Sequence, residues 1–131
     1  MFKTLLSSKI HRATVTQADL DYVGSISVDK DLLEATGLVE NEQVQVLNIS
    51  NGNRLTTYVI EAPAGSGMIC INGAAAHLMN VGDLVIICSY AHIEQSQIKD
   101  HKPKIALVDG NNRVLKMLDK QEAQTKYAEL V

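Results

Sequence analysis

Hydrophobic and polar residues alternate along several short segments of the chain, a pattern typical of strands with one buried face. The strands expected from this alternation, or from short apolar runs, are residues 9–16, 43–49, 54–60, 68–72 and 84–90. Asn51-Gly52 lies between two of these segments and favours a tight hairpin turn. Residues 109–112, with the sequence Asp-Gly-Asn-Asn, predict a second hairpin. Short strands joined in hairpins indicate a mainly β protein.

Two segments depart from this period and predict short helices. Asp29 can cap a helix with acidic residues in its first turn, and Gly37 suits the end of that helix. A helical turn is expected at residues 74–79, and residues 119–131 form a polar C-terminal tail with weak helical character. Many short strands with few helices favour a small β-barrel with crossing connections over a helical bundle or a βαβ sheet.

Composition and charge narrow the classes of function. A chain of 131 residues suits one domain, which we place at residues 1–131. Only 4% of residues are aromatic and Asp and Glu outnumber Lys and Arg by 15 to 12, so no nucleic-acid partner is expected. No apolar run approaches the ~20 residues that cross a bilayer, so no membrane partner is expected. Cys70 and Cys88 lie in apolar runs, which favours reduced, structural thiols and a cytoplasmic protein.

Histidines and glycines offer two weaker candidates for binding sites. The histidines are His11, His77, His92 and His101. They lack the spacing of metal ligands, so no metal is expected. Residues 65–67, Gly-Ser-Gly, resemble a phosphate-binding loop but lack the following Lys, so an ordinary loop is favoured.

Two places carry candidate chemistry. Arg54 shares a predicted strand face with Tyr58, so a guanidinium could hold a carboxylate beside a phenol; an exposed Arg and a half-buried Tyr are the alternative. At Gly24-Ser25 the serine hydroxyl can attack the preceding carbonyl if the peptide is distorted, and a simple turn is the alternative. The resulting N-to-O acyl shift, followed by elimination and hydrolysis, would leave a pyruvoyl group at residue 25.

Four motifs occur in order between Met1 and about Tyr90. They are Lys9-Ile10-His11-Arg12, Tyr22-Val23-Gly24-Ser25, Asn51-Gly52-Asn53-Arg54-Leu55-Thr56-Thr57-Tyr58 and Asn72-Gly73-Ala74-Ala75-Ala76-His77. Together they resemble the pyruvoyl-dependent aspartate 1-decarboxylase family. This resemblance implies a six-stranded double-psi β-barrel with short helices, assembled as a homotetramer with active sites at subunit interfaces. It also implies self-cleavage between Gly24 and Ser25, which gives a β chain of residues 1–24 and an α chain of residues 25–131.

The resemblance also implies a reaction. L-Aspartate would form a Schiff base with the pyruvoyl group made from Ser25, and would lose carbon dioxide to give β-alanine for pantothenate and coenzyme A synthesis. That group is the only cofactor expected, with neither metal nor pyridoxal phosphate (PLP). Tyr58 would reprotonate the substrate carbon. The residues expected around the substrate are Lys9, Arg54, Thr57, Gly73, Ala74 and Ala75, with Asn72, Tyr22 and His11 in supporting positions.

Several questions stay open at this point. Thr57 faces away from Arg54 and Tyr58 by simple alternation, so its contact with substrate needs a twist, a bulge or a role through the backbone. A non-catalytic barrel that binds acidic metabolites or another protein is one alternative function. A pyruvoyl decarboxylase for another amino acid is a second, although the paired cations Lys9 and Arg54 favour a dicarboxylate. Cleavage could be spontaneous or assisted by a maturation protein.

Overall fold

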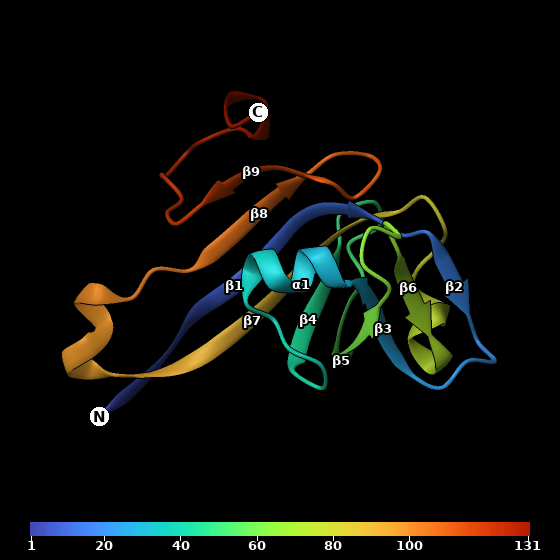
Figure 1. Ribbon diagram of the computed structural model, residues 1–131, viewed down its shortest axis with the longest axis horizontal. Helices are drawn as coiled ribbons and strands as arrows, with labels where there is room; N and C mark the ends of the chain where they lie inside the picture. The colour runs from blue at the N-terminus through green and yellow to red at the C-terminus, as the bar shows by residue number, and fades with distance from the viewer.

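The computed structural model describes residues 1–131 and is built mainly from strands (Figure 1). The strands are β1 (Phe2–Thr14), β2 (Gln17–Asp19), β3 (Ser25–Asp29), β4 (Gln43–Asn48), β5 (Arg54–Ala62), β6 (Ile69–Asn72), β7 (Leu84–Glu94), β8 (Lys104–Val108) and β9 (Val114–Leu118). The helices are α1 (Lys30–Thr36) and the 3-10 helices η1 (Gly73–Leu78), η2 (Gln95–Asp100) and η3 (Tyr127–Glu129). The strands pair in the order β2-β6-β3-β5-β4-β7-β1-β8-β9. No helix is long and apolar enough to cross a membrane.

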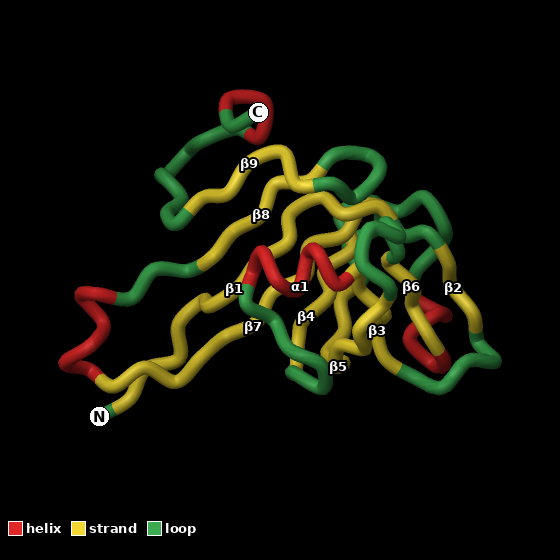
Figure 2. The backbone as a smooth tube through the Cα atoms, in the orientation of Figure 1, coloured by secondary structure: helices red, strands yellow, loops and turns green.

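The first strand closes this ladder into a barrel. β2 follows β1 after only two residues, Val15 and Thr16. The N–H of Val15 donates to the carbonyl oxygen of Asp83, just before β7, at 2.9 Å, and the N–H of Thr16 donates to that of Ile69 in β6 at 2.8 Å. Because β2 pairs with β6 while β1 pairs with β7, the ladder returns to the segment where it began. Figure 2 shows the strands enclosing the right-hand part of the molecule.

The prediction of a mainly β fold with short helices is confirmed, but the predicted count of six strands differs from the structure. The ring has six strand positions, and the chain has nine strands. The difference arises because the first position is split into β1 and β2, and because β8 and β9 extend the sheet beyond the ring. The double-psi connection remains a prediction.

Aliphatic side chains fill the barrel, as expected for a chain with one Phe and no Trp. Ile10, Ile26, Val59, Ile71 and Ile87 come from five different strands and are each 0% exposed. Their neighbours in sequence point outward, because successive side chains of a strand alternate between the two faces of a sheet. The core therefore decides which strand residues lie on the outer face of the barrel, where the polar candidate residues are found.

The predicted local signals mostly hold. Asp29 caps α1 by accepting the N–H of Asp31 at 2.8 Å, and Gly37 ends it with a φ of 78°. The hairpin around Gly52 joins β4 to β5 as predicted. β1 and β7 are longer than predicted, because their outer halves pair with one another from Phe2↔Glu94 inward and form an arm that extends from the barrel (Figure 1).

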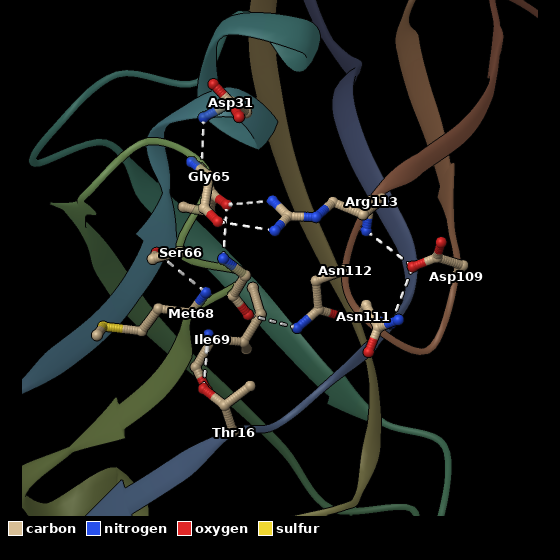
Figure 3. Close-up of polar contacts among 12 residues, drawn as sticks. Thr16, Asp31, Gly65, Ser66, Met68, Ile69, Asp109, Asn111, Asn112 and Arg113 are labelled. Atoms are coloured by element: carbon tan, nitrogen blue, oxygen red, sulfur yellow. Dashed lines mark hydrogen bonds and ion pairs between the residues drawn. The ribbon is translucent and has the colours of Figure 1, made fainter.

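A buried carboxylate anchors the end of β3. The Asp29 side chain is 0% exposed and accepts the backbone N–H groups of Gly65 at 3.0 Å and Gly67 at 2.8 Å. Arg113 lies 3.7 Å from the same carboxylate and donates to the Gly65 carbonyl at 2.8 Å (Figure 3). The amide of Asn112 donates to the Gly67 carbonyl at 2.8 Å. The glycine-containing loop and the β8–β9 turn are thereby fixed against the strand that begins at Ser25.

Candidate active site

Ser25, the first residue of β3, is strained and its hydroxyl is unsatisfied. Its φ is 95°, a value that side-chain-bearing residues rarely adopt and that costs on the order of 1–3 kcal/mol. The residue is 3% exposed, and its Oγ has no hydrogen-bond partner. A buried hydroxyl without a partner costs about 1–3 kcal/mol more. Strain and a free hydroxyl thus coincide at the residue that follows Gly24.

The backbone of β6 and η1 packs closely against the Gly24-Ser25 peptide. Ser25 pairs with Asn72 across antiparallel strands. At Gly73, which has a φ of 64°, an added β-carbon would lie 3.0 Å from the Gly24 Cα and 3.2 Å from the Tyr22 carbonyl oxygen. Gly73 therefore permits an approach that no other residue allows. Two more predicted residues lie just beyond it in η1, Ala74 exposed and Ala75 half-buried.

Tyr58 lies beside Ser25 on the outer face of the barrel. Ile26 of β3 pairs with Val59 of β5 in parallel, and both side chains belong to the core. Tyr58 immediately precedes Val59, so its side chain lies on the opposite, outer face, and Ser25 is the residue level with it on the neighbouring strand. Neighbouring strands are about 4.8 Å apart. The structure therefore brings the phenol, which is 40% exposed, to the strand next to the candidate serine.

The outer face of β5 carries Arg54 but not Thr57. Arg54 and Tyr58 are exposed, whereas Thr57 is half-buried, and no bulge interrupts the pairing of β5 with β4. The side chain of Thr57 therefore keeps the opposite orientation that alternation predicts. Arg54 makes no ion pair and lines an outward groove of about 340 Å³ together with Gln45 and Tyr90.

Lys9 and His11 share this outer face but lie on the far side of the groove. The pairs Lys9↔Cys88, Cys88↔Gln45 and Gln45↔Thr56 run across β1, β7, β4 and β5. Lys9 is thus three strand spacings, about 14 Å along the sheet, from Thr56 on the strand of Arg54. Within one chain, the candidate site is divided between two parts of the barrel.

The C-terminal segment covers His11. The ring of Tyr127 in η3 lies 5.4 Å from the His11 ring, and the Arg12 guanidinium lies 4.7 Å from the centre of the same Tyr127 ring. The Nδ1 atom of His11 is buried without a partner. Burial, and then the positive charges of Lys9 and Arg12, lower the pKa of His11 to about 4. The imidazole is therefore neutral at pH 7.

Two polar residues next to the site were not predicted from the sequence. Ser27 and Cys70 both contact the side chain of Asn72, at 3.0 Å each. A signal for Ser27 exists in residues 25–29, Ser-Ile-Ser-Val-Asp, where polar and apolar residues alternate as in a strand. Because Gly24-Ser25 is also typical of a turn, the strand that begins at Ser25 was not predicted, nor was its polar outer face.

Comparison with known proteins gives matches over nearly the whole chain. A family model described as aspartate decarboxylase matches residues 1–115. The aspartate 1-decarboxylase of Bacillus licheniformis is 51% identical over 125 residues, which cover 95% of this chain and 98% of that protein. That of Caldicellulosiruptor saccharolyticus is 56% identical, covering 93% and 95% of the two chains. That of Corynebacterium efficiens is 59% identical, covering 88% and 85%.

A solved structure also matches, but only distantly. The crystal structure of the computationally designed msDPBB_sym2 protein aligns with a TM-score of 0.38 at 18% identity, covering 65% of this chain and 96% of that one. A likeness at this level does not assign the barrel connections.

Proposed function

The chain belongs to the aspartate decarboxylase family, and we propose that this decarboxylase converts L-aspartate to β-alanine and carbon dioxide through a pyruvoyl group made from Ser25. The observation that carries the proposal is the buried Ser25 hydroxyl, which has no hydrogen-bond partner and belongs to a residue with a φ of 95°. These features suit a hydroxyl that reacts with its own backbone.

The cleavage chemistry needs only the chain itself and water. The Ser25 Oγ adds to the carbonyl carbon of Gly24, the peptide C–N bond breaks, and the hydroxyl proton ends on the released nitrogen. Loss of the Ser25 Cα proton then breaks the Cβ–O bond and frees the Gly24 carboxylate. Water replaces the nitrogen, which leaves as ammonia. The products are residues 1–24 and a chain of residues 25–131 that begins with a ketone.

Decarboxylation of an amino acid leaves an electron pair on Cα that ordinary side chains cannot delocalise, and the ketone-bearing group supplies the electron sink. Tyr58 is the proposed general acid, since its phenol lies on the outer face of the strand beside Ser25. Arg54 offers an exposed guanidinium, without an ion pair, for a substrate carboxylate. The Gly73 backbone and Ala75 supply the close wall of the pocket.

We propose that residues from a second copy of the chain complete the active site. Lys9 and His11 lie three strand positions from β5 in one chain, about 14 Å along the sheet, and Arg54 lies four residues, about 13 Å, from Tyr58 along β5, so neither cation lies beside Ser25 within one chain. A site at an interface, where β1 of one subunit faces β3 and β5 of the next, brings these residues together. A homotetramer with such interface sites is the assembly proposed. In this arrangement Thr57 acts through its backbone or in cleavage, and Tyr22 stays beside the cleaved bond.

Intact mass and carbon dioxide release test the function together. We expect two species, residues 1–24 and 25–131, and release of carbon dioxide from L-aspartate in preference to a panel of other amino acids. A fully active preparation with an uncleaved chain would exclude the pyruvoyl mechanism. Preferred release from another amino acid would reassign the substrate and leave the cleavage chemistry in place.

Mixing two inactive variants tests the shared site. Lys9→Ala and Arg54→Ala each remove one part of every pocket. If the two residues act from different subunits, co-expressed variants assemble some intact pockets, and activity returns to about a quarter of wild type for random mixing. Activity that stays at the level of the single variants would place both residues in one chain.

The wider setting of the reaction is part of the proposal. β-Alanine would feed pantothenate and coenzyme A synthesis in the cytoplasm. The buried, free thiols of Cys70 and Cys88 support a reducing compartment. Cleavage of the chain purified alone, or only after addition of cell extract, would decide between spontaneous and assisted maturation.

A further inference from the structure

The side-chain amide of Asn72 is held from two sides. The Cys70 thiol donates to Asn72 Oδ1 at 3.0 Å, and Asn72 Nδ2 donates to Ser27 Oγ at 3.0 Å. The strand pairs Ser25↔Asn72 and Ser27↔Cys70 place all four residues on one face of β3 and β6, opposite the core residues Ile26 and Ile71. Three side chains therefore form a short polar line beside Ser25.

The protonation of Cys70 fixes the direction of this line. Burial, and then the negative charge of Asp19, raise the pKa of the Cys70 thiol. The thiol therefore stays protonated at neutral pH and donates its S–H. The amide oxygen of Asn72 accepts it, and the N–H side of the amide faces Ser27, whose Oγ accepts. In the opposite orientation the amide N–H would face the thiol sulfur, which is a weaker acceptor than the hydroxyl oxygen of Ser27.

The Asn72 amide belongs to the residue that pairs with Ser25, so its orientation has a consequence for the cleavage chemistry. When Ser25 attacks, negative charge develops on the carbonyl oxygen of Gly24. An N–H donor held in place stabilises such charge, whereas an amide oxygen in the same position repels it. Asn72 is the strand partner of Ser25 and uses one of its two N–H groups on Ser27. Because Cys70 and Ser27 hold the amide in this orientation, its second N–H, which has no other partner, can donate to the developing charge.

We propose that Ser27 and Cys70 are positioning residues that hold the Asn72 amide in the orientation needed for cleavage between Gly24 and Ser25. Neither residue contacts the substrate or the reacting atoms; both act through Asn72. This inference rests on the proposed function, because it assigns a role in the cleavage that creates the reactive group.

Paired variants separate hydrogen bonding from packing. Cys70→Ala and Ser27→Ala each remove a partner of the amide, whereas Cys70→Ser replaces the thiol donor by a hydroxyl donor and Ser27→Thr keeps the hydroxyl acceptor. The full chain is synthesised in a short pulse, and the fraction cleaved is followed by intact mass. We expect cleavage about 10–100-fold slower in both alanine variants and within about threefold of wild type in both conservative variants. Ser89→Ala is the matched control, because Ser89 is a buried serine on β7 without a partner.

A double-mutant cycle shows whether the residues act through Asn72. In an Asn72→Ala background, adding Cys70→Ala or Ser27→Ala should slow cleavage no further, since the positioned amide is already absent. Additive effects in that background would overturn the inference. Equal slowing by Cys70→Ser and Cys70→Ala, or slowing by Ser89→Ala that matches the others, would also overturn it, because packing alone would then account for the result.

The wild-type chain keeps this test separate from that of the proposed function. A wild type that stays whole while decarboxylating aspartate removes the proposed cleavage, and with it the role of both residues. A wild type that cleaves, with Cys70→Ala and Ser27→Ala that cleave equally fast, leaves the proposed function intact and overturns only the positioning role.

Discussion

Gly73 and Gly24 approach so closely that a β-carbon on Gly73 would lie 3.0 Å from the Cα of Gly24. Because Gly73 also has a φ of 64°, Gly73→Ala should destabilise the fold by about 1–3 kcal/mol and displace the peptide that is cut. We expect a lower Tm together with slower cleavage by intact mass. Gly110→Ala is the control, since a β-carbon there meets nothing within 4 Å. Normal cleavage in Gly73→Ala would show that the close packing of Gly73 against Gly24 is not needed for cleavage.

Replacing Ser25 by Ala should abolish cleavage and decarboxylation together. Relative to the uncleaved wild-type chain it also removes a buried hydroxyl without a partner, so the free energy of unfolding should stay unchanged or rise by about 1 kcal/mol. Mass spectrometry and urea unfolding measure the two effects on the same sample. A Ser25→Ala chain that is still cut would identify a different attacking group.

Tyr58→Phe removes the phenol on the strand beside Ser25. Decarboxylation should slow by about 10²–10⁴, as expected for loss of a general acid, while cleavage proceeds. The cleaved fraction in the same preparation is the internal control, because it shows that the site has formed. Wild-type turnover would assign the proton donor elsewhere.

Asp29→Ala should cost about 1–3 kcal/mol, because it leaves the N–H groups of Gly65 and Gly67 without their shared acceptor. Urea unfolding measures the loss. The exposed Asp100, changed to Ala, should shift stability by less than about 0.5 kcal/mol. Equal stability of the two variants would contradict the anchoring role of Asp29.

His11 should make stability depend on pH. Its pKa is lowered to about 4 in the fold from 6.5 in a free side chain, so between these values the unfolded chain binds more protons. The contribution is complete above pH 6.5 and is lost as the pH falls toward 4. Urea unfolding from pH 7 to pH 4 should therefore show a steeper loss for wild type than for His11→Gln. His77→Gln, at an exposed position, should follow the wild-type profile.

The sequence predicted those parts of the fold that local chemistry decides. Asp29 and Gly37 mark the ends of α1 through their own hydrogen bond and φ, and Asn51-Gly52 specifies its hairpin. The closure of the barrel at Thr16 could not be predicted, because it depends on a bond to Ile69, fifty-three residues away.

In the candidate site, too, only the features that local sequence decides could be predicted. Alternation correctly placed Arg54 and Tyr58 on one face of β5 and Thr57 on the other. The contact between Asn72 and Ser27 was not predicted. Ser27 lies in a strand that begins at Ser25, where the sequence Gly-Ser is typical of a turn and the backbone has an unusual φ. The separation of Lys9 from Arg54 could not be predicted either, because it follows from the order of strands around the barrel rather than from spacing along the chain.

The placement of β1 determines what a cut after Gly24 would leave behind. β1 lies between β7 and β8, and its continuation β2 pairs with β6. The cleaved N-terminal fragment would thus contain a central strand of the sheet, held by backbone hydrogen bonds to a neighbouring strand on each side. We expect both fragments to co-migrate as one particle under native conditions and to part only in denaturant, so that maturation changes the covalent chain without dismantling its architecture.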